Sequence, residues 1–310
     1  MARHGSGPGG GIVASAEFDV TISICSWNTV DDLRVCLTSL AAIREEANFE
    51  VFVVDNNSED GSAEMVEAEF PWVRLERSAT NRGFTGGHNH AAELRRGEHL
   101  FPLNSDAVVR PGAVRELLNY LAANPEVGIV GPRLLNPDGS LQFSCRRFPN
   151  PVAALFRNTP LGKLFPKNRF TRDYLMQEWN HDGPREVDWV SGAAFIIRGE
   201  LIGRIGLFDP EYFMFCEDVD LCWRAWKAGS KVHYFPSPTV VHAIGHSTDK
   251  APNRMIGRFH RSMFRFFAKN RVPELPILAR PFALAFAATA LLVRASVFVA
   301  GNKMDILRRR

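Results

Sequence analysis

Three carboxylates within four residues, Glu217, Asp218 and Asp220, form the densest group of reactive side chains in this chain. The run Tyr-Phe-Met-Phe at 212–215 precedes them directly. Aromatic surroundings penalise a charged carboxylate and raise its pKa, which suits it to act as a general base. The alternative is structural: Asp218 would cap the helix that Gly229 ends, with the other two acids near its positive end. Taken alone, the segment favours the cap.

A second polar cluster, residues 54–62, follows an apolar strand expected at residues 49–55. Open α/β sheets bind ligands at the carboxyl ends of their strands, which makes Asp55 a candidate binding residue. The alternative is an Asx-rich turn that leads into a helix cap, and without other information the turn is the better explanation.

Three glycines, at positions 83, 86 and 87, lie in the segment 81–89 before an expected helix. Glycines at such a place let the backbone approach a phosphate closely, and Arg82 and His88 would add charge. The pattern is neither GxGxxG nor a P-loop, so by itself it is weak evidence for a nucleotide site.

An apolar strand expected at residues 99–103 leads into Asn104, Ser105 and Asp106. A lone Asp after such a strand is either a turn residue or a hard oxygen ligand for a divalent ion that bridges a diphosphate. These residue types alone do not decide between the two.

Apolar strands alternate with amphipathic helices through the first half of the chain, which predicts a mostly parallel α/β sheet. Residues 140–186 are rich in Pro, Phe, Arg and Asn, and we expect loops and short helices there, as in a variable substrate-binding region. The predicted strands are 19–27, 49–55, 73–77, 99–103, 127–135, 231–235 and 239–242, and the predicted helices are 30–43 (capped by Asp31 or Asp32), 62–70, 89–97 and 112–124.

The polar segments occur in the order and spacing of a known family. Over about residues 18–270, the sequence resembles the family 2 glycosyltransferases of the GT-A fold, most closely the bacterial rhamnosyltransferase-like branch. The resemblance implies a mixed, mostly parallel sheet flanked by helices. Each matching run is weak alone, but the series is specific: Val-Asp-Asn-Asn-Ser-Glu-Asp-Gly-Ser at 54–62, Asn-Arg-Gly-Phe-Thr-Gly-Gly-His-Asn at 81–89, Asn-Ser-Asp at 104–106 and Glu-Asp at 217–218.

The resemblance also implies roles for single residues. The Glu-Asp pair resembles the motif that carries the catalytic base, with Asp218 as the base and Glu217 supporting it. The segment 189–194 resembles an acceptor-side wall, which assigns Trp189 and Gly192 to the acceptor. The implied nucleotide-sugar-binding residues are Trp27, Asp55 (base recognition), Asn81, Gly83, His88, Asn89, Asn104 and Asp106.

Related enzymes place a metal-binding His at the end of a late strand, so Asp106 and His242 are the implied ligands of Mn²⁺ or Mg²⁺. Imidazole suits Mn²⁺ better than Mg²⁺, and the alternative for His242 is a purely structural role. Two positions depart from the family pattern. Asn104 replaces the first acid of the DxD-type motif, so metal affinity would depend on the other two residues, and Trp27 stands where Tyr is usual.

The implied reaction is a single displacement, with inversion, that moves a sugar from a nucleoside diphosphate sugar to an acceptor hydroxyl. The expected donor is dTDP-rhamnose, and the expected acceptor is a saccharide or lipid-linked saccharide in cell-envelope polysaccharide synthesis. The alternatives are another donor, such as a UDP-hexose, and a non-catalytic nucleotide-sugar-binding protein. A processive synthase is disfavoured because neither Gln142 nor Gln177 begins a QxxRW motif.

Charge separates the C-terminus from the rest of the chain. Residues 252–310 hold 12 Lys/Arg and 2 Asp/Glu, a net charge of +10, whereas residues 1–251 have a net charge of −7. The apolar run 281–293 is shorter than the roughly 20 residues that a membrane span needs. We therefore expect a basic amphipathic extension at 251–310 that lies on the membrane surface. The alternative is a helical hairpin packed on the domain or on a second subunit of a homo-oligomer.

The expected organisation is a disordered segment at 1–17, a GT-A domain at 18–250 and the extension at 251–310. Five cysteines without a CxxC spacing suggest a reducing compartment and no structural zinc. We expect no signal peptide, and no nucleic-acid partner because the tail lacks a recognisable module. The predicted location is therefore the cytoplasm, peripheral at the inner face of the cell membrane.

Overall fold

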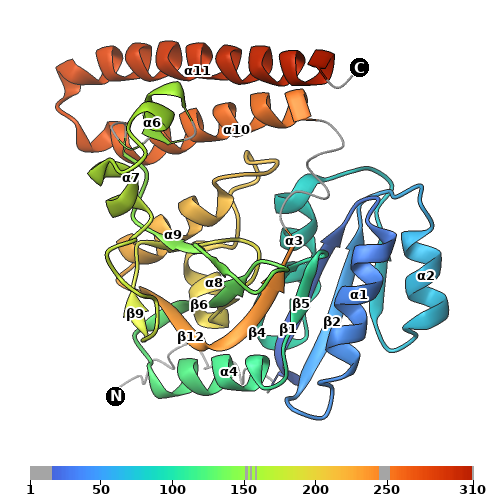
Figure 1. Cartoon of the computed structure of the whole chain (residues 1–310). Coiled ribbons are helices and arrows are strands. Elements are labelled where there is room, and N and C mark those ends of the chain that lie inside the picture. The colour runs from blue at the N-terminus through green and yellow to red at the C-terminus, as the bar shows by residue number, and fades with distance from the viewer. Residues whose placement is uncertain (1–15, 151–152, 154–155, 158, 244–251, 309–310) are drawn as a thin grey trace, which may run out of the picture.

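A ten-stranded sheet organises this computed structural model, which describes residues 16–150, 153, 156–157, 159–243 and 252–308 (Figure 1). Its order is β3-β2-β1-β4-β11-β6-β12-β5, with β7 beside β6 and β9 beside β12, while β8 and β10 pair separately. The pairs among β1, β2, β3 and β4 and the pair β6–β12 are parallel, whereas β11 and β5 run antiparallel to their neighbours. The predicted mixed, mostly parallel sheet is confirmed.

The strands are β1 (Phe18–Ser26), β2 (Phe49–Asp55), β3 (Arg74–Arg77), β4 (Gly97–Asn104), β5 (Ala107–Val109), β6 (Val127–Leu135), β7 (Leu141–Gln142), β8 (Cys145–Arg146), β9 (Arg185–Glu186), β10 (Trp189–Val190), β11 (Ile196–Ile197) and β12 (Lys231–His242).

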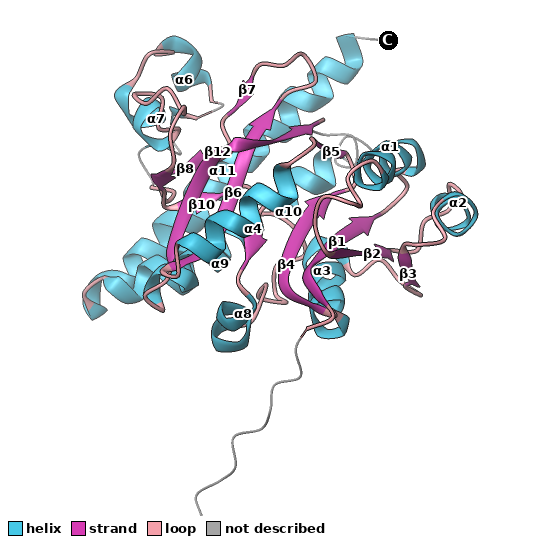
Figure 2. Cartoon of the chain, turned by 90° about the horizontal axis from the view of Figure 1, so that it is seen from below, coloured by secondary structure: helices cyan, strands magenta, loops and turns pink. Residues whose placement is uncertain are grey.

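Helices pack on both faces of this sheet, and each face has its own core (Figure 2). Neighbouring strand residues point to opposite faces, so Val130 of β6 belongs to one core and Ile129 to the other. The first core receives α1 (Val30–Ala41), α2 (Ser62–Glu69) and α4 (Ala113–Ala123), and the second receives α8 (Gly199–Ile205) and α9 (Glu217–Lys227). The short helices α6 (Pro160–Leu164) and α7 (Arg169–Tyr174) lie in the predicted irregular region.

Several predicted boundaries differ from the structure. Helix α1 has Thr29 as its N-cap, so neither Asp31 nor Asp32 caps it. Its first N–H, that of Val30, donates instead to the Asp60 carboxylate at 2.9 Å. The two late strands predicted at 231–235 and 239–242 form one strand, β12, whose register against β6 shifts between Phe235 and Thr239. Prolines at positions 236 and 238 lack the N–H that a regular ladder needs.

The C-terminal residues form a helical hairpin that lies across one end of the molecule, at the top of Figure 1. Helix α10 (Pro252–Phe266) continues through short turns of other helix types, η1 (Phe267–Arg271), η2 (Val272–Glu274) and η3 (Ile277–Ala279), into α11 (Arg280–Arg308). This arrangement corresponds to the hairpin alternative for the extension. The predicted disorder at 1–17 falls almost wholly outside the described residues, as does the predicted boundary at 250.

Candidate active site

One cleft of about 620 Å³ gathers the catalytic, acceptor-side and metal residues that the sequence predicted. The residues come from the end of β4, from β10, from the start of α9 and from the end of β12, which are far apart in the chain. Helices α10 and α11 also contribute to the lining. The predicted residues that line the cleft are Asn104, Asp106, Trp189, Gly192, Glu217, Asp218 and His242.

Helix α9 begins at Glu217 because the two preceding residues turn the chain sharply. Phe215 and Cys216 have φ angles of 72° and 64°, in the left-handed region that side chains disfavour. Cys216 is the N-cap residue and no side chain caps the helix, so the cap interpretation of Asp218 is wrong. Asp218 instead accepts hydrogen bonds at Oδ2 from the Gly192 N–H (2.9 Å) and at Oδ1 from its neighbour's N–H (2.8 Å).

The two carboxyl groups at the start of α9 hold protons differently. Burial raises the pKa of Glu217 well above its usual range, and the nearby charge of Asp218 adds to this shift. Burial also raises the pKa of Asp218, but the Gly192 and Val219 N–H groups and the charge of Arg146 oppose that rise. Glu217 is 5% exposed and its Oε2 has no hydrogen-bond partner among the described residues. Within the pair, these contacts favour the proton on Glu217 and the negative charge on Asp218.

The third carboxylate, Asp220, serves a different purpose. Its side chain is fully buried and accepts hydrogen bonds from Arg224, Lys269 and Asn270, each at 2.8 Å. The last two residues belong to η1, so this carboxylate joins the catalytic helix to the C-terminal hairpin.

Asp106 and His242 meet at the metal end of the cleft, where His242 Nε2 lies 3.3 Å from Asp106 Oδ1. Gln142 Oε1 lies 2.8 Å from His242 Nδ1, so the proton of a neutral His242 sits on Nδ1. Nε2 then accepts a hydrogen bond from the Asn104 side-chain amide at 2.9 Å, and this amide has to turn away before Nε2 can bind a metal ion. These two donors fit a divalent ion that also binds diphosphate oxygens and water. No group of three or more His, Cys, Asp or Glu residues is placed to hold a metal ion within the described ranges.

Apart from Asn104 and Asp106, the predicted nucleotide-sugar-binding residues lie outside the lining of this cleft, at the ends of β1 and β2 and before or within α3 (Gly83–Leu94). Asp55 is buried and accepts the Ser58 N–H at Oδ2 (3.0 Å), while Oδ1 has no partner within the described ranges. A free carboxylate oxygen at a strand end suits the N–H of a nucleotide base. Trp27 is partly exposed just after β1, and Asn81 Oδ1 accepts the Gly83 N–H at 2.8 Å.

The glycine-rich run does not form an open phosphate loop, because it makes up the first turns of α3. A Cβ on Gly83 would lie 2.5 Å from the main-chain oxygen of Phe213, and one on Gly87 would lie 2.2 Å from the Cys25 sulfur. These glycines let α3 pack closely against β1 and against the loop before α9. These contacts explain why glycine is needed at both positions, and the approach of the run's main chain to a phosphate stays a prediction.

His88 and Asn89 also hold elements together. His88 is fully buried, with Nδ1 2.8 Å from Ser23 Oγ, and burial lowers its pKa to about 3. Its ring cannot reach a nucleotide in this structure. The Asn89 side chain donates to and accepts from the main chain of Phe208, at 2.9 and 3.0 Å. Their prediction as nucleotide contacts followed from the motif, which does not distinguish inward from outward side chains.

The site also depends on residues that were not predicted from the sequence: Arg146 and Met214 line the cleft, and Gln142 contacts His242. Gln142 fixes His242 through the side-chain contact and through an Nε2–H bond to the His242 carbonyl (3.1 Å). The guanidinium of Arg146 stacks over the Trp189 ring at 4.9 Å. Both residues lie near the start of the irregular 140–186 region, where no periodicity marks them.

A mixed sheet of this order, with acids at strand ends and a carboxylate pair opening a late helix, defines a nucleotide-sugar transferase of the GT-A class. The chain belongs to the family described as "Glycosyltransferase like family 2", which matches residues 17–264, and it is a glycosyltransferase. It is 32% identical over 243 residues to an N-acetylglucosaminyl-diphospho-decaprenol L-rhamnosyltransferase of Mycobacterium tuberculosis, covering 75% of this chain and 78% of that one. A shorter match, 35% over 86 residues, links it to the rhamnosyltransferase WbbL of Escherichia coli, across 28% of this chain and 33% of that one.

Solved structures share the fold at low sequence identity. The mannosyltransferase PcManGT from Pyrobaculum calidifontis, in complex with GDP-Man and Mn²⁺, superposes with a TM-score of 0.54 and 20% identity over 94% of this chain and 81% of that one. GalNAc-T7 with UDP, GalNAc and Mn²⁺ gives a TM-score of 0.57 and 18% identity over 73% of this chain and 43% of that one. The predicted family and GT-A fold are confirmed.

Proposed function

We propose that the protein moves rhamnose from dTDP-rhamnose, with inversion, to a hydroxyl of a saccharide carried on a lipid diphosphate in cell-envelope polysaccharide synthesis. The observation that carries the proposal is the meeting of Asp218, held by the Gly192 N–H, with Asp106 and His242 in one cleft. The relative from M. tuberculosis, named for a diphospho-decaprenol acceptor and for L-rhamnosyl transfer, supports the choice of donor and acceptor.

In this mechanism Asp218 accepts the proton of the acceptor hydroxyl while that oxygen attacks the anomeric carbon. The Gly192 N–H holds the carboxylate in place, and protonated Glu217 keeps a second negative charge away from it. Asp106 and His242 would bind a divalent ion, which when bound stabilises negative charge on the leaving diphosphate. Asp55 Oδ1 would receive an N–H of the nucleotide base.

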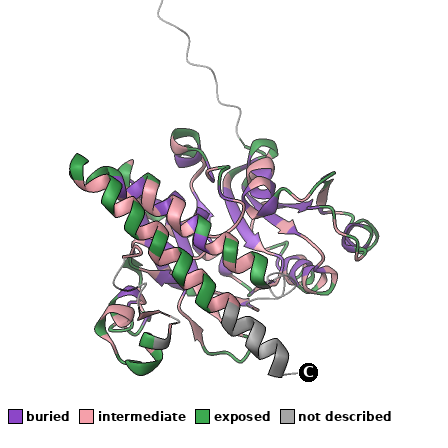
Figure 3. Ribbon diagram, turned by 90° about the horizontal axis from the view of Figure 1, so that it is seen from above, coloured by how far each residue is buried: buried purple, intermediate pink, exposed green. Residues whose placement is uncertain are grey.

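We also propose that α11 holds the enzyme at the membrane surface, in the cytoplasm. The segment Ile277–Val299 has 23 residues with a mean hydropathy of 2.1, so by length and composition it is sufficient to cross a bilayer, contrary to the estimate from the shorter run 281–293. None of it is buried (Figure 3). Basic residues of α10 and η1 are engaged by the domain: Arg265 pairs with Asp209, and Lys269 with Asp220. Contact between α11 and the membrane would therefore depend mainly on apolar side chains.

Release of nucleotide from a panel of sugar donors, with a prenyl-diphosphate-linked N-acetylglucosamine as acceptor, tests the proposal. We expect turnover with dTDP-rhamnose and Mn²⁺, loss of turnover in excess chelator, and loss in Asp106→Ala, with a milder loss in His242→Ala. Turnover with a UDP-hexose alone would replace the donor. Donor binding without turnover on any acceptor would indicate a non-catalytic binding protein, and full activity in chelator would contradict the metal assignment.

A further inference from the structure

Three arginines face the same cleft without a carboxylate partner. Arg146 extends from β8, Arg157 from the irregular region and Arg294 from α11, and all three line the cleft. Their hydrogen bonds go to uncharged groups: Arg146 to the Phe143 carbonyl at 3.0 Å and Arg157 to the Tyr174 hydroxyl at 3.2 Å.

Arg294 likewise lacks an anionic partner. It donates to the Arg157 carbonyl at 3.1 Å and contacts the Met263 sulfur at 3.6 Å, and its Nε has no partner within the described ranges. No ion pair joins any of the three arginines to a carboxylate in the described part of the chain, although most other ion pairs there involve arginine.

The three charges also lie close enough to affect one another. The pKa of Arg157 is lowered by burial and by the positive charges of Arg146 and Arg294. Arg146 in turn lies near Asp218, whose pKa its charge lowers. Like charges held together in a partly buried cluster are unfavourable, and an anion with several oxygens would relieve the repulsion and satisfy the free N–H groups.

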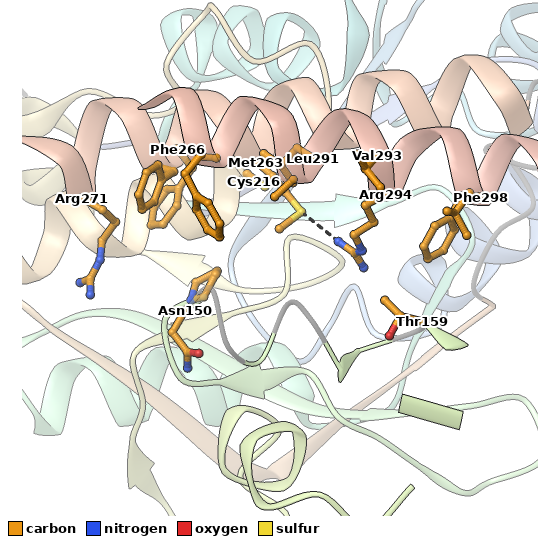
Figure 4. Close-up of a pocket in the computed structure, with 16 residues that line it drawn as sticks. Asn150, Thr159, Cys216, Met263, Phe266, Arg271, Leu291, Val293, Arg294 and Phe298 are labelled. Atoms are coloured by element: carbon orange, nitrogen blue, oxygen red, sulfur yellow. Dashed lines mark hydrogen bonds between the residues drawn. The ribbon is translucent and has the colours of Figure 1, made fainter. Parts of the chain in front are cut away.

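An apolar cavity of about 640 Å³ adjoins this cluster, between the α10–α11 hairpin and the residues Pro149, Asn150 and Thr159 (Figure 4). Its walls include Phe266, Phe286, Leu291 and Val297. The cavity and the cleft share six lining residues: Pro149, Asn150, Cys216, Met263, Arg294 and Phe298. Figure 4 shows Arg294 among the apolar side chains of the cavity, so the cationic group lies where the apolar space meets the cleft.

We infer that Arg146, Arg157 and Arg294 bind the diphosphate of a polyprenyl-diphosphate-linked acceptor and that the adjoining cavity takes the first prenyl units of its chain. The inference rests on the proposed function in that it takes the acceptor to be lipid-linked. The donor lacks a lipid chain, and its diphosphate is assigned to the Asp106 end of the cleft. A fatty acid would fill the cavity but would offer the three guanidinium groups only one carboxylate.

Farnesyl diphosphate is a short probe for this site, and its binding to the full-length protein can be measured by calorimetry. We expect Arg157→Gln and Arg294→Gln each to weaken its binding about tenfold or more, because each removes charge-assisted hydrogen bonds. Arg271→Gln is the matched control. Arg271 lines the same apolar cavity but not the cleft, and it pairs with Glu274 at 3.5 Å. The affinity of the Arg271→Gln variant for farnesyl diphosphate should match that of the parent protein.

Ala290→Trp tests the apolar part, because Ala290 lines the cavity. We expect this substitution to weaken the binding of farnesyl diphosphate and to leave the binding of inorganic diphosphate as it is in the parent. Thermal unfolding of each variant confirms that it is folded. Equal binding of farnesyl diphosphate to parent, Arg157→Gln and Arg294→Gln, or equal binding of farnesol and farnesyl diphosphate, would overturn the inference.

Binding of dTDP separates this inference from the proposed function. If the arginine variants bind farnesyl diphosphate more weakly but bind dTDP with the affinity of the parent, the acceptor assignment is supported. If they lose both ligands equally, the arginines serve the donor and the inference is wrong. If the parent binds farnesyl diphosphate through the arginines but releases no nucleotide from any donor, the proposed transfer fails while the lipid-diphosphate site stands.

Discussion

At the residue scale, the assignment of roles to Asp218 and Glu217 follows from their hydrogen bonds rather than from their order in the motif. Asp218 accepts two main-chain N–H groups, which stabilise its anion, whereas Glu217 has an unpartnered oxygen in a buried setting. We expect Asp218→Asn to lower kcat by about 10²–10⁴ with little effect on donor affinity. Glu217→Gln preserves a neutral side chain of the same shape and should cost less than about tenfold. Steady-state kinetics and donor titration measure both, and the reverse ranking would make Glu217 the base.

The protonated state of Glu217 also has a consequence for stability. An unfolded glutamate ionises near pH 4.3, whereas burial raises the pKa of Glu217 well above that value in the fold. Between the two pKa values the folded protein holds a proton that the unfolded chain releases. The stability from this group is therefore complete below about pH 4.3 and is lost as the pH rises toward the folded pKa.

Glu217→Gln removes this dependence because glutamine does not titrate. We expect the variant to gain stability relative to the parent as the pH rises from about 4 to 8. Urea denaturation at a series of pH values checks this, with Glu200→Gln, at an exposed position on α8, as the control. A constant difference between parent and Glu217→Gln over that range would show that Glu217 is ionised in the fold.

Single residues were predictable where a motif names them and the fold leaves them facing the cleft, as at Asp106, Asp218 and His242. His88 and Asn89 belong to an equally clear motif, yet α3 turns their side chains toward Ser23 and Phe208. Gln142 belongs to no motif. Its contact with His242 spans 100 residues of sequence, and one sequence carries no trace of it.

At the element scale, the bounds of segments with a strongly periodic sequence were predicted well, whereas boundaries that depend on tertiary packing were not. Strand β6 was predicted at its observed bounds because its apolar run ends at polar residues on both sides. Helix α3 starts at Gly83, six residues before the predicted start. Glycine disfavours helices, but the first turns of α3 require it where they contact Phe213, at Gly83, and β1, at Gly87.

Gly87→Ala tests that packing. The added methyl group would lie 2.2 Å from the sulfur of Cys25 on β1, so we expect a loss of about 1–3 kcal/mol of stability. Gly203→Ala is the matched control, because Gly203 lies within α8 and a Cβ there meets nothing within 4 Å. That change should raise stability by about 0.5–1 kcal/mol. Denaturation curves compare the two, and a neutral Gly87→Ala would mean that α3 can shift on the sheet.

At the scale of the whole molecule, the C-terminal extension was expected to be basic and amphipathic, and its packing on the domain as a hairpin was the alternative to the favoured membrane-surface location. Asp209 and Asp220 are ordinary acids in the sequence, and only the fold shows that they receive Arg265 and Lys269. The charges that suggested a membrane anchor are thus partly neutralised by the domain. What remains exposed is the apolar side of α11.

Vesicle flotation tests the role of that side. Phe282 is 77% exposed and Leu292 is 69% exposed, and we expect serine at both positions to reduce binding to anionic and neutral vesicles severalfold. Val35→Ser, at an exposed position on α1, is the control. Binding that resists alkaline carbonate would indicate a full transmembrane insertion of α11, and absence of binding by the parent would leave the hairpin as a cover or a subunit interface.

The family match ends at residue 264, yet Arg294 and Phe298 of α11 still line the catalytic cleft. The floor of the cleft therefore comes from the segment that matches the family model, whereas part of its roof comes from beyond that segment. If the roof binds the lipid diphosphate, as inferred above, substitutions in the last fifty residues or so of the chain would change the acceptor and leave the residues assigned to the donor untouched.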